Sequence, residues 1–438
     1  MPVAVIGAGA AGLVTAVELE AEGLKPVVFE ANASPGGIWI YNPRVPDDPL
    51  GRAPAPSVTH GALYASLRTN LPRDLMALRR FPFTTDLGGD PRRFPGHAEV
   101  LRYLRAYSRT FGLDRYVRTD ARVTQVQPRA DDDTPWTAAH PRPPARWRVH
   151  WLRGGREHHE NFDAVAVCNG HYHQPRIPAL PGLDAFAGRV LHSFAYREPR
   201  GFEGATVALL GAKSSGVDLS RELATVARRV LLCARDLPRA DGLGPQRNLD
   251  HRPPIVRVEP RALCLSDGTR EPNVDALVLC TGYRYTFPFL PARARLLDPV
   301  HDRVFPLYLD LVAARARTLA FIGLPFSVVP FPLFEHQARL WARVLSGRVA
   351  LPDAPARLAH ARHREARMSA AGVAPRHRLR YAGEHQFRYG AGLAALAGDV
   401  PPPAWRAPLY AAVGQARQRD PWGYRDAVLP TGEQLMNG

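Results

Sequence analysis

The chain has 438 residues, and its 57 Lys and Arg against 41 Asp and Glu give a formal net charge of +16. A hydrophobic content of 45% and a charged content of 22% exclude a wholly disordered or fibrous chain, and four cysteines are too few for a disulfide scaffold. All but two of the basic residues are arginines scattered along the whole sequence, which argues against a nucleic-acid partner because such proteins gather their cations on one face.

The first predicted unit is a strand, a glycine turn, a helix and a second strand. Residues 3–6 form an apolar strand that stops at Gly7, Gly9 and Gly12, and a helical pattern precedes a second strand at 26–30. The first glycine permits the tight turn, the second lets backbone approach a pyrophosphate, and the third lets helix and strand pack closely. We therefore expect a dinucleotide here, with its phosphates at the helix N-terminus.

The end of the second strand indicates which nucleotide binds. Glu30 can accept hydrogen bonds from a ribose 2′-hydroxyl and would repel a 2′-phosphate, so this unit favours FAD or NAD over NADP. A double glycine ending at Gly37 follows, and then Ile38 and Trp39. We expect a flavin ring to pass close to this backbone, with Trp39 packed beside it.

The region that follows contains a predicted surface loop. Residues 129–146 are rich in Pro, Asp, Ala and Arg and separate strand-like runs at 121–126 and 146–151. We expect no chemistry in this loop.

Two further strands bracket a second nucleotide-binding unit. Residues 164–168 and 275–280 are apolar runs that each end near a glycine. We predict an α/β fold with two Rossmann-like domains, in which an NADPH-binding domain (171–281) is inserted into an FAD-binding domain (1–170 and 282–438).

The second unit repeats the strand–turn–helix–strand pattern of the first. A strand at 205–210 leads to a turn that keeps glycines at Gly211 and Gly216, and a helix at 217–227 precedes a strand at 230–233. The inserted unit is therefore also predicted to bind a dinucleotide.

Polar residues in and after this turn indicate NADPH. Lys213 takes the place of the middle glycine and brings an ammonium to the phosphates, while Ser214 and Ser215 can cap the helix or donate to phosphate. Arg235 stands where Glu30 stands in the first unit, and its guanidinium can pair with a 2′-phosphate.

The remaining sequence predicts no membrane segment. No basic region precedes the first strand, so we expect no secretory leader, and the apolar run at 319–334 is interrupted by prolines. Residues 352–408 are helical in period to about residue 397 and then Pro-rich, and we expect them to wrap the first domain. A cytoplasmic protein is the expectation, and the sequence leaves a homodimer open.

The segment between the two glycine turns carries a family fingerprint. Phe186, Gly188, His192 and Tyr196 have the spacing FxGxxxHxxxY, which resembles the motif of flavin-containing monooxygenases; Baeyer–Villiger monooxygenases carry Trp in place of Tyr196. Further similar motifs are Gly36–Trp39, Leu63–Asn70, Phe81–Phe83, Asn169–Tyr172, Cys280–Tyr283, Phe287–Leu290, Phe334–Gln337 and Leu345–Arg348. The resemblance covers about residues 1–350 and is closest to the plant S-oxygenases, including those acting on glucosinolates.

This resemblance implies an enzyme. Members of the family use NADPH to reduce FAD, form a C4a-hydroperoxyflavin with O2, and transfer one oxygen atom to a soft nucleophile, a thioether sulfur or an amine nitrogen. Excluding water from the site matters more in such a cycle than substrate-side catalytic groups.

The resemblance also implies roles for single residues. Asn70 is the implied catalytic residue, hydrogen-bonding both flavin and NADP+, and Arg68 lies along the NADP+. His60, Val123 and Gln337 are implied FAD contacts. From the residues alone, Asn70 would be a turn residue before a proline.

Other functions remain as alternatives. A redox sensor or a peroxide-producing NADPH oxidase would carry the same two nucleotide sites. A thioredoxin-reductase-like enzyme needs a local cysteine pair, and the four cysteines here are far apart in sequence. Histidines 158, 159, 171 and 173 lack a zinc ligand set, so no metal site is predicted.

Overall fold

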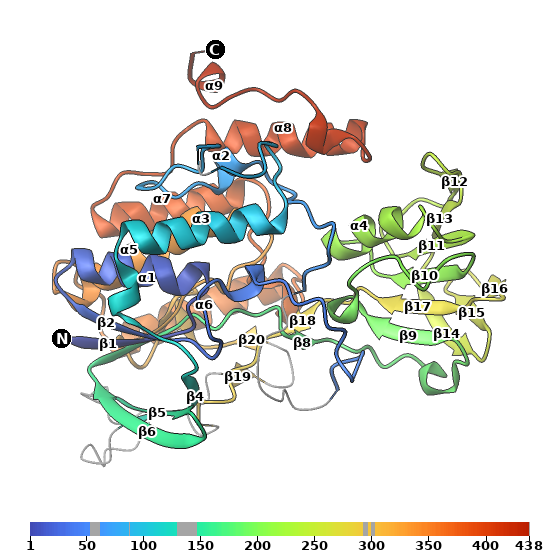
Figure 1. Ribbon diagram of the computed structural model, residues 1–438. Helices are drawn as coiled ribbons and strands as arrows, with labels where there is room; N and C mark the ends of the chain where they lie inside the picture. The colour runs from blue at the N-terminus through green and yellow to red at the C-terminus, as the bar shows by residue number, and fades with distance from the viewer. Residues whose placement is uncertain (53–61, 87, 129–146, 292–296, 299–302, 438) are drawn as a thin grey trace. The chain divides into compact units, whose positions relative to one another are not determined.

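The computed structural model describes residues 1–52, 62–86, 88–128, 147–291, 297–298 and 303–437. The chain divides into two compact units. The first unit comprises Met1–Ile40, Leu71–His171 and Tyr285–Gly438, and the second comprises Tyr41–Asn70 and Tyr172–Arg284 (Figure 1).

A seven-stranded sheet in the order β21-β22-β23-β7-β1-β2-β3 organises the first unit. The strands from β23 to β3 are parallel to one another, and β21 and β22 run antiparallel at one edge. Their bounds are β1 Pro2–Ile6, β2 Lys25–Phe29, β3 Val117–Arg118, β7 Ala164–Val167, β21 Leu307–Tyr308, β22 Val312–Ala313 and β23 Leu319–Phe321. The predicted α/β class with parallel sheets is confirmed.

Alternation along the buried strand β1 gives the sheet two apolar faces. Val3 and Val5 join a core with helices α1 (Ala10–Ala21), α3 (His97–Thr110) and α5 (Pro330–Leu345). Ala4 and Ile6 join a core on the opposite face with the antiparallel strands β4 (Arg122–Pro128), β5 (Trp147–Arg153) and β6 (Arg156–Phe162). Figure 1 shows this helical layer above β1 and β2 and the β4–β6 sheet below them.

The C-terminal helices complete the first unit. They are α5, α6 (Ala354–Ala370), α7 (Glu384–Ala397), α8 (Arg406–Arg419) and α9 (Gln434–Asn437), and α2 spans Arg73–Met76. A buried ion pair fixes α5 to α1, because the Arg339 guanidinium lies 2.8 Å from the Glu18 carboxylate. Arg339 also pairs at 3.2 Å with Glu335 of its own helix. Helix α8 follows the Pro-rich stretch, beyond the point where the sequence pattern predicts the helical period to end. No helix within the described residues is long and apolar enough to cross a membrane.

A six-stranded sheet in the order β12-β13-β11-β10-β17-β9 organises the second unit. Its strands are β9 Arg189–His192, β10 Thr206–Leu210, β11 Arg229–Cys233, β12 Ala240–Leu243, β13 Leu249–Arg252 and β17 Ala276–Leu279, all parallel except β12. Helix α4 (Ser214–Leu223) covers one face, and the antiparallel strands β14 (Ile255–Glu259), β15 (Ala262–Leu265) and β16 (Arg270–Pro272) cover the other.

Helix α4 differs from its prediction. It begins at the turn itself and ends at Leu223, whereas the sequence pattern predicts 217–227. The amides of Ala224 and Ala227 still bond back to carbonyls of the last turn, which explains why the apolar pattern runs on beyond the helix. Strands β12–β16 are not among the predicted elements.

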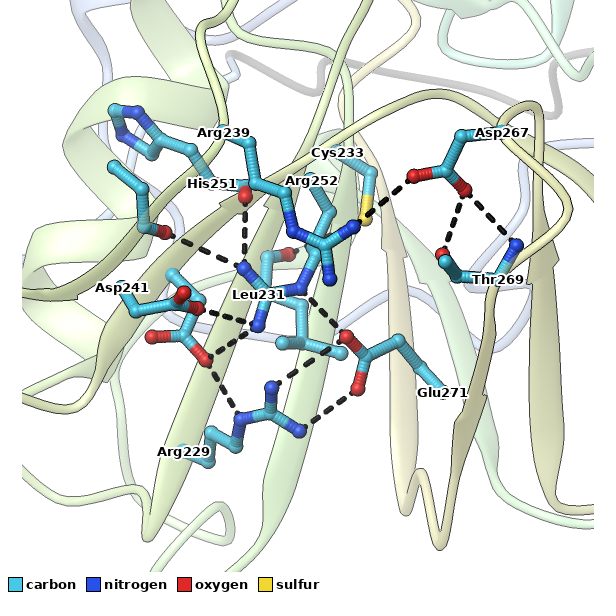
Figure 2. Close-up of polar contacts among 12 residues, drawn as sticks. Arg229, Leu231, Cys233, Arg239, Asp241, His251, Arg252, Asp267, Thr269 and Glu271 are labelled. Carbon is cyan, nitrogen blue, oxygen red and sulfur yellow. Dashed lines mark hydrogen bonds and ion pairs between the residues drawn. The ribbon is translucent and has the colours of Figure 1, made fainter.

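An ion-pair network centred on the buried residues Asp250, Arg252 and Glu271 fastens the β12–β13 hairpin to this sheet (Figure 2). Arg229 on β11 donates to Asp250 (2.7 Å) and to Glu271 (2.8 Å), and Arg252 donates to Glu271 at 2.6 Å and pairs with Asp241 at 2.6 Å. Because each buried charge meets opposite charges, the network is satisfied, and it joins the start of β11 to β13.

Residues 41–70 belong to the second unit, whereas the predicted boundaries place them in the FAD domain. The physical reason is local: the Ala65 amide donates to the Arg197 carbonyl at 2.8 Å, and the Arg197 guanidinium donates to the Asn42 carbonyl at 2.7 Å. Short pieces complete the description: β8 Gln174–Pro175, β18 Tyr283–Arg284, β19 Leu297–Asp298 and β20 Arg303–Val304, with helical turns at Gly37–Trp39, Leu113–Arg115, Leu183–Ala185, Ser193–Ala195, Pro375–His377 and Tyr424–Asp426.

Candidate functional site: two nucleotide turns

The first glycine turn joins β1 to α1 and leaves no room for side chains. Gly7 has φ +103°, and a Cβ on it would lie 2.6 Å from the Cys168 carbonyl oxygen at the end of β7. A Cβ on Gly12 would lie 1.8 Å from the Gly7 carbonyl oxygen. The backbone is therefore folded onto itself in a cradle that a Cβ would fill, which is the geometry a bound pyrophosphate requires.

Gly9 has a different reason to be glycine. Its φ of −75° is open to any residue, but a Cβ on Gly37 would lie 2.8 Å from the Gly9 Cα, so the two backbones touch. Gly9 caps α1 without a side chain, so the first N–H groups of the helix can donate to a bound anion. The double-glycine segment thus packs directly on the phosphate turn.

Glu30 is buried and bonded to this turn. Its carboxylate accepts from the Ala8 amide at 2.8 Å, from the Asn32 amide at 2.9 Å and from the Asn32 side chain at 2.7 Å. One oxygen takes two of these donors and the other takes one, so acceptor capacity for a ribose hydroxyl remains. Ala8 and Asn32 were not predicted; Asn32 lies two residues after Glu30, and nothing else in the sequence marks its role.

The other implied FAD residues lie in different surroundings. Trp39 is half-buried and edge-on to Phe331, with ring centroids 6.3 Å apart, and Ile38 beside it is also half-buried. Gln337 is fully buried, where it accepts from the Gly323 amide at 2.9 Å and donates to the Tyr389 hydroxyl at 3.0 Å.

Val123 and His60 remain predicted FAD contacts. Val123 lies on β4 and packs against the core formed with β5 and β6. His60 lies outside the described residues.

The second glycine turn, between β10 and α4, repeats the first almost atom for atom. Gly211 has φ +110° and its Cβ would lie 2.5 Å from the Cys280 carbonyl oxygen, while a Cβ on Gly216 would lie 1.8 Å from the Gly211 carbonyl oxygen. Lys213 occupies the N-cap position with φ −89°, which a lysine adopts without strain. This turn accordingly has the same cradle with an added cation.

Lys213 and Arg235 are both exposed. The Lys213 ammonium lies 3.9 Å from the carboxylate of Asp236, the neighbour of Arg235. Arg235 follows β11, whose end is fixed because the Ala234 amide donates to the Arg252 carbonyl at 3.0 Å. The lysine and the turn that carries Arg235 therefore lie side by side, and two cations can meet one phosphate-bearing ligand.

Asn70 lies at the start of α4. Its side-chain amide donates to the Ser214 hydroxyl at 3.4 Å, and Asn70 itself is exposed. Arg68 in the same segment is half-buried, and Ser215 is the second residue of the helix. The structure thus brings Asn70 to the predicted phosphate turn, a placement that only the family resemblance indicates.

The cysteines beside the two turns are inert. Burial raises the pKa of Cys168 to about 12, against a smaller lowering by the hydrogen bond with Thr15, and burial raises the pKa of Cys280 to about 12. All four cysteines are free. These buried thiols stay protonated near neutral pH and offer no thiol–disulfide chemistry.

Comparisons with known proteins agree with this geometry. A family model described as flavin-binding monooxygenase-like matches residues 1–238 and 247–385. The flavin-containing monooxygenase FMO GS-OX-like 4 of Arabidopsis thaliana is 39% identical over 435 residues, covering 97% of this chain and 93% of its own.

Solved structures agree as well. The S-allyl-L-cysteine S-oxygenase of Allium sativum is 36% identical with a TM-score of 0.90, covering 100% of this chain and 97% of its own. Tmm from a Pelagibacter strain is 20% identical with a TM-score of 0.80 over 98% of this chain and 93% of its own, which shows the shared fold. Together these similarities favour an oxygenating enzyme over the redox sensor or peroxide-producing oxidase that the sequence leaves open.

Proposed function

Because the chain belongs to the flavin-binding monooxygenase-like family and is an NADPH- and FAD-dependent monooxygenase, we propose that it oxygenates a soft nucleophile. Its proposed physiological substrate is a small thioether, oxygenated at sulfur. The observation that carries this proposal is the similarity, over the whole chain, to an enzyme that oxygenates the sulfur of S-allyl-L-cysteine. The reaction balances: NADPH and a proton supply two electrons, one atom of O2 bonds to sulfur, and the other leaves as water.

The chain's own residues have separate tasks in this reaction. FAD, when bound, supplies the activated oxygen. The glycine cradle at Gly7–Gly12 and the first amides of α1 hold its pyrophosphate, and Glu30 accepts from its ribose. Lys213 and Arg235 bind NADPH phosphates, and Asn70 hydrogen-bonds the nicotinamide nucleotide.

Sulfur suits such an arrangement chemically. A thioether sulfur carries its nucleophilic lone pair at every pH, whereas an alkyl amine is largely protonated near neutral pH and has to lose a proton first. Oxygenation at sulfur therefore needs no base in the site, and binding and exclusion of water carry the catalysis.

A substrate screen tests the proposal. Matched pairs of S-alkyl cysteines and tertiary amines of similar size are supplied with NADPH and air, and oxygenated product, peroxide and NADPH are counted together. We expect close to one sulfoxide per NADPH for the thioethers. N-oxide without sulfoxide, or peroxide equal to the NADPH consumed with every substrate, would refute it.

The Arg235→Ala variant should lose its preference for NADPH. A charge-assisted hydrogen bond to phosphate contributes about 1.5–3 kcal/mol, so the KM for NADPH should rise roughly tenfold to a hundredfold while the KM for NADH stays nearly constant. Steady-state kinetics with both nucleotides measure this. Arg239→Ala is the matched control, since Arg239 is exposed and pairs with Asp267 at 3.1 Å. Equal effects on the two nucleotides would remove Arg235 from the 2′-phosphate.

We further propose that the enzyme works in the cytoplasm. Its four cysteines are unpaired, which suits a reducing compartment.

A further inference from the structure

The segment that carries Asn70 contacts one face of helix α4. Ser214, Asp218 and Glu222 are spaced four residues apart on this helix, so their side chains lie one above another along a single face. The facing segment is 64–70, from the same unit of the structure.

Three polar contacts join the segment to this face. The Tyr64 hydroxyl donates to Asp218 at 3.1 Å, the Ser66 hydroxyl donates to Glu222 at 2.6 Å, and the Asn70 amide donates to Ser214 at 3.4 Å. The shortest contact is made by Glu222, and the Asn70 contact is long for a hydrogen bond. The position of Asn70 therefore depends on what holds the rest of the segment.

Glu222 receives a second donor from another part of the chain. The Tyr196 hydroxyl, from the family fingerprint, donates to its other carboxylate oxygen at 3.0 Å. Tyr196 is almost fully buried, and its ring meets that of Tyr64 edge-on with centroids 5.9 Å apart. The Ala65 amide bonds to the carbonyl of Arg197, the next residue after Tyr196. Glu222 thus ties the fingerprint and the Asn70 segment to one helix.

The negative charges of Asp218 and Glu222 explain why hydroxyl groups donate to this face of α4. Asp218 and Glu222 are like charges one helical turn apart, which destabilises a helix. Burial raises the pKa of Glu222, and the hydrogen bonds from Ser66 and Tyr196 oppose that rise. Without the segment, two carboxylates would face each other with fewer donors.

We propose that Glu222 is a positioning residue for the reaction: by accepting from Ser66 and Tyr196, it fixes the 64–70 segment on α4 and so holds Asn70 at the NADPH phosphate turn. This inference rests on the proposed function of Asn70. It also gives a role to the fingerprint residue Tyr196, whose hydroxyl donates to Glu222.

Hydrogen exchange of the flavin-loaded enzyme tests whether Glu222 fixes the 64–70 segment on α4. In Glu222→Ala, amide exchange in the peptide covering 63–70 should quicken about tenfold, because the local opening loses a hydrogen bond to a charged group. Ser66→Ala removes the same bond from the other side and serves if Glu222→Ala fails to fold. Ser220→Ala is the matched control, since that hydroxyl bonds to the Val217 carbonyl of its own helix. Unchanged exchange in both test variants would overturn the proposal.

The yield of sulfoxide tests whether this positioning matters for the reaction. The ratio of sulfoxide to NADPH consumed should fall severalfold in Glu222→Ala and Ser66→Ala, with FAD content unchanged, and should be largely restored in Glu222→Gln, which keeps an acceptor. Ser220→Ala should match the wild type. Faster exchange with an unchanged ratio would make Glu222 merely structural and overturn the proposal. If the wild type itself makes no sulfoxide, the proposed function fails, and the exchange result still decides whether Glu222 holds the segment.

Discussion

Replacing Asn70 with alanine is expected to abolish oxygenation, lowering the rate of product formation by at least about a hundredfold, as the loss of a preorganised hydrogen-bond donor does in other enzymes. FAD should stay bound, because the first glycine turn and Glu30 belong to the other unit of the structure. The Asn70 amide has two N–H donors and a carbonyl acceptor, and among the residues that the structure describes its side chain bonds to the Ser214 hydroxyl alone. NADPH consumption should continue and end in peroxide.

The measurement counts sulfoxide, peroxide and NADPH in one reaction and compares the flavin absorbance of the purified variants. Asn161→Ala is the matched control, because it removes the same side chain from the exposed strand β6. A variant at Asn70 that still makes sulfoxide at the wild-type rate would show that this amide takes no part in the chemistry.

The second large effect should come from a matched pair of glycines. A Cβ on Gly12 or on Gly216 would lie 1.8 Å from a backbone carbonyl oxygen of its own turn, so either turn must open to accept alanine. Overpacking of this kind costs about 1–3 kcal/mol, or roughly a fivefold to 150-fold loss of affinity. Gly12→Ala should therefore lose FAD, whereas Gly216→Ala should keep FAD and show a raised KM for NADPH.

Flavin content after dialysis and NADPH kinetics separate the two outcomes. Gly414→Ala, in helix α8 with open space around its Cα, is the control for the substitution itself and should leave both quantities unchanged. Loss of FAD from Gly216→Ala with retention in Gly12→Ala would reverse the assignment of the two turns.

The glycine turns were accessible from sequence because their constraint is local. Gly7 and Gly12, like Gly211 and Gly216, meet backbone within the same strand–turn–helix unit or its neighbouring strand, and the spacing of residues records this. Gly9 shows the limit of that reasoning. Gly9 is glycine because Gly37 lies against it, and not because its φ angle is strained. The same unstrained backbone explains why Lys213 is tolerated at the matching position.

Long-range polar pairing was not accessible from sequence. Asn70 and Ser214 are 144 residues apart, and Ser66 and Glu222 are 156 apart, so no periodicity or turn signal links them. The donors Tyr64 and Ser66 belong to common residue types that mark no special role. Asp218 and Glu222 are four residues apart, as acidic residues on an exposed helix face often are. Only the fold brings them together.

The orientation of side chains was the second feature that the sequence could not predict. Gln337 was assigned to FAD by resemblance, and its FAD contact stays a prediction; the structure shows both ends of its amide bonded to Gly323 and Tyr389. The C-terminal helices were also only partly predicted, since the prolines before α8 break the period without preventing a further helix at Arg406–Arg419.

Following the fate of molecular oxygen tests most directly whether this enzyme is a thioether monooxygenase. The enzyme, NADPH and an S-alkyl cysteine are incubated under oxygen-18 gas, and the product is analysed by mass spectrometry together with the NADPH consumed. We expect a sulfoxide that carries one heavy oxygen atom and forms in near-equal amount to the NADPH oxidised. Unlabelled product, or labelled peroxide in place of sulfoxide, would contradict it.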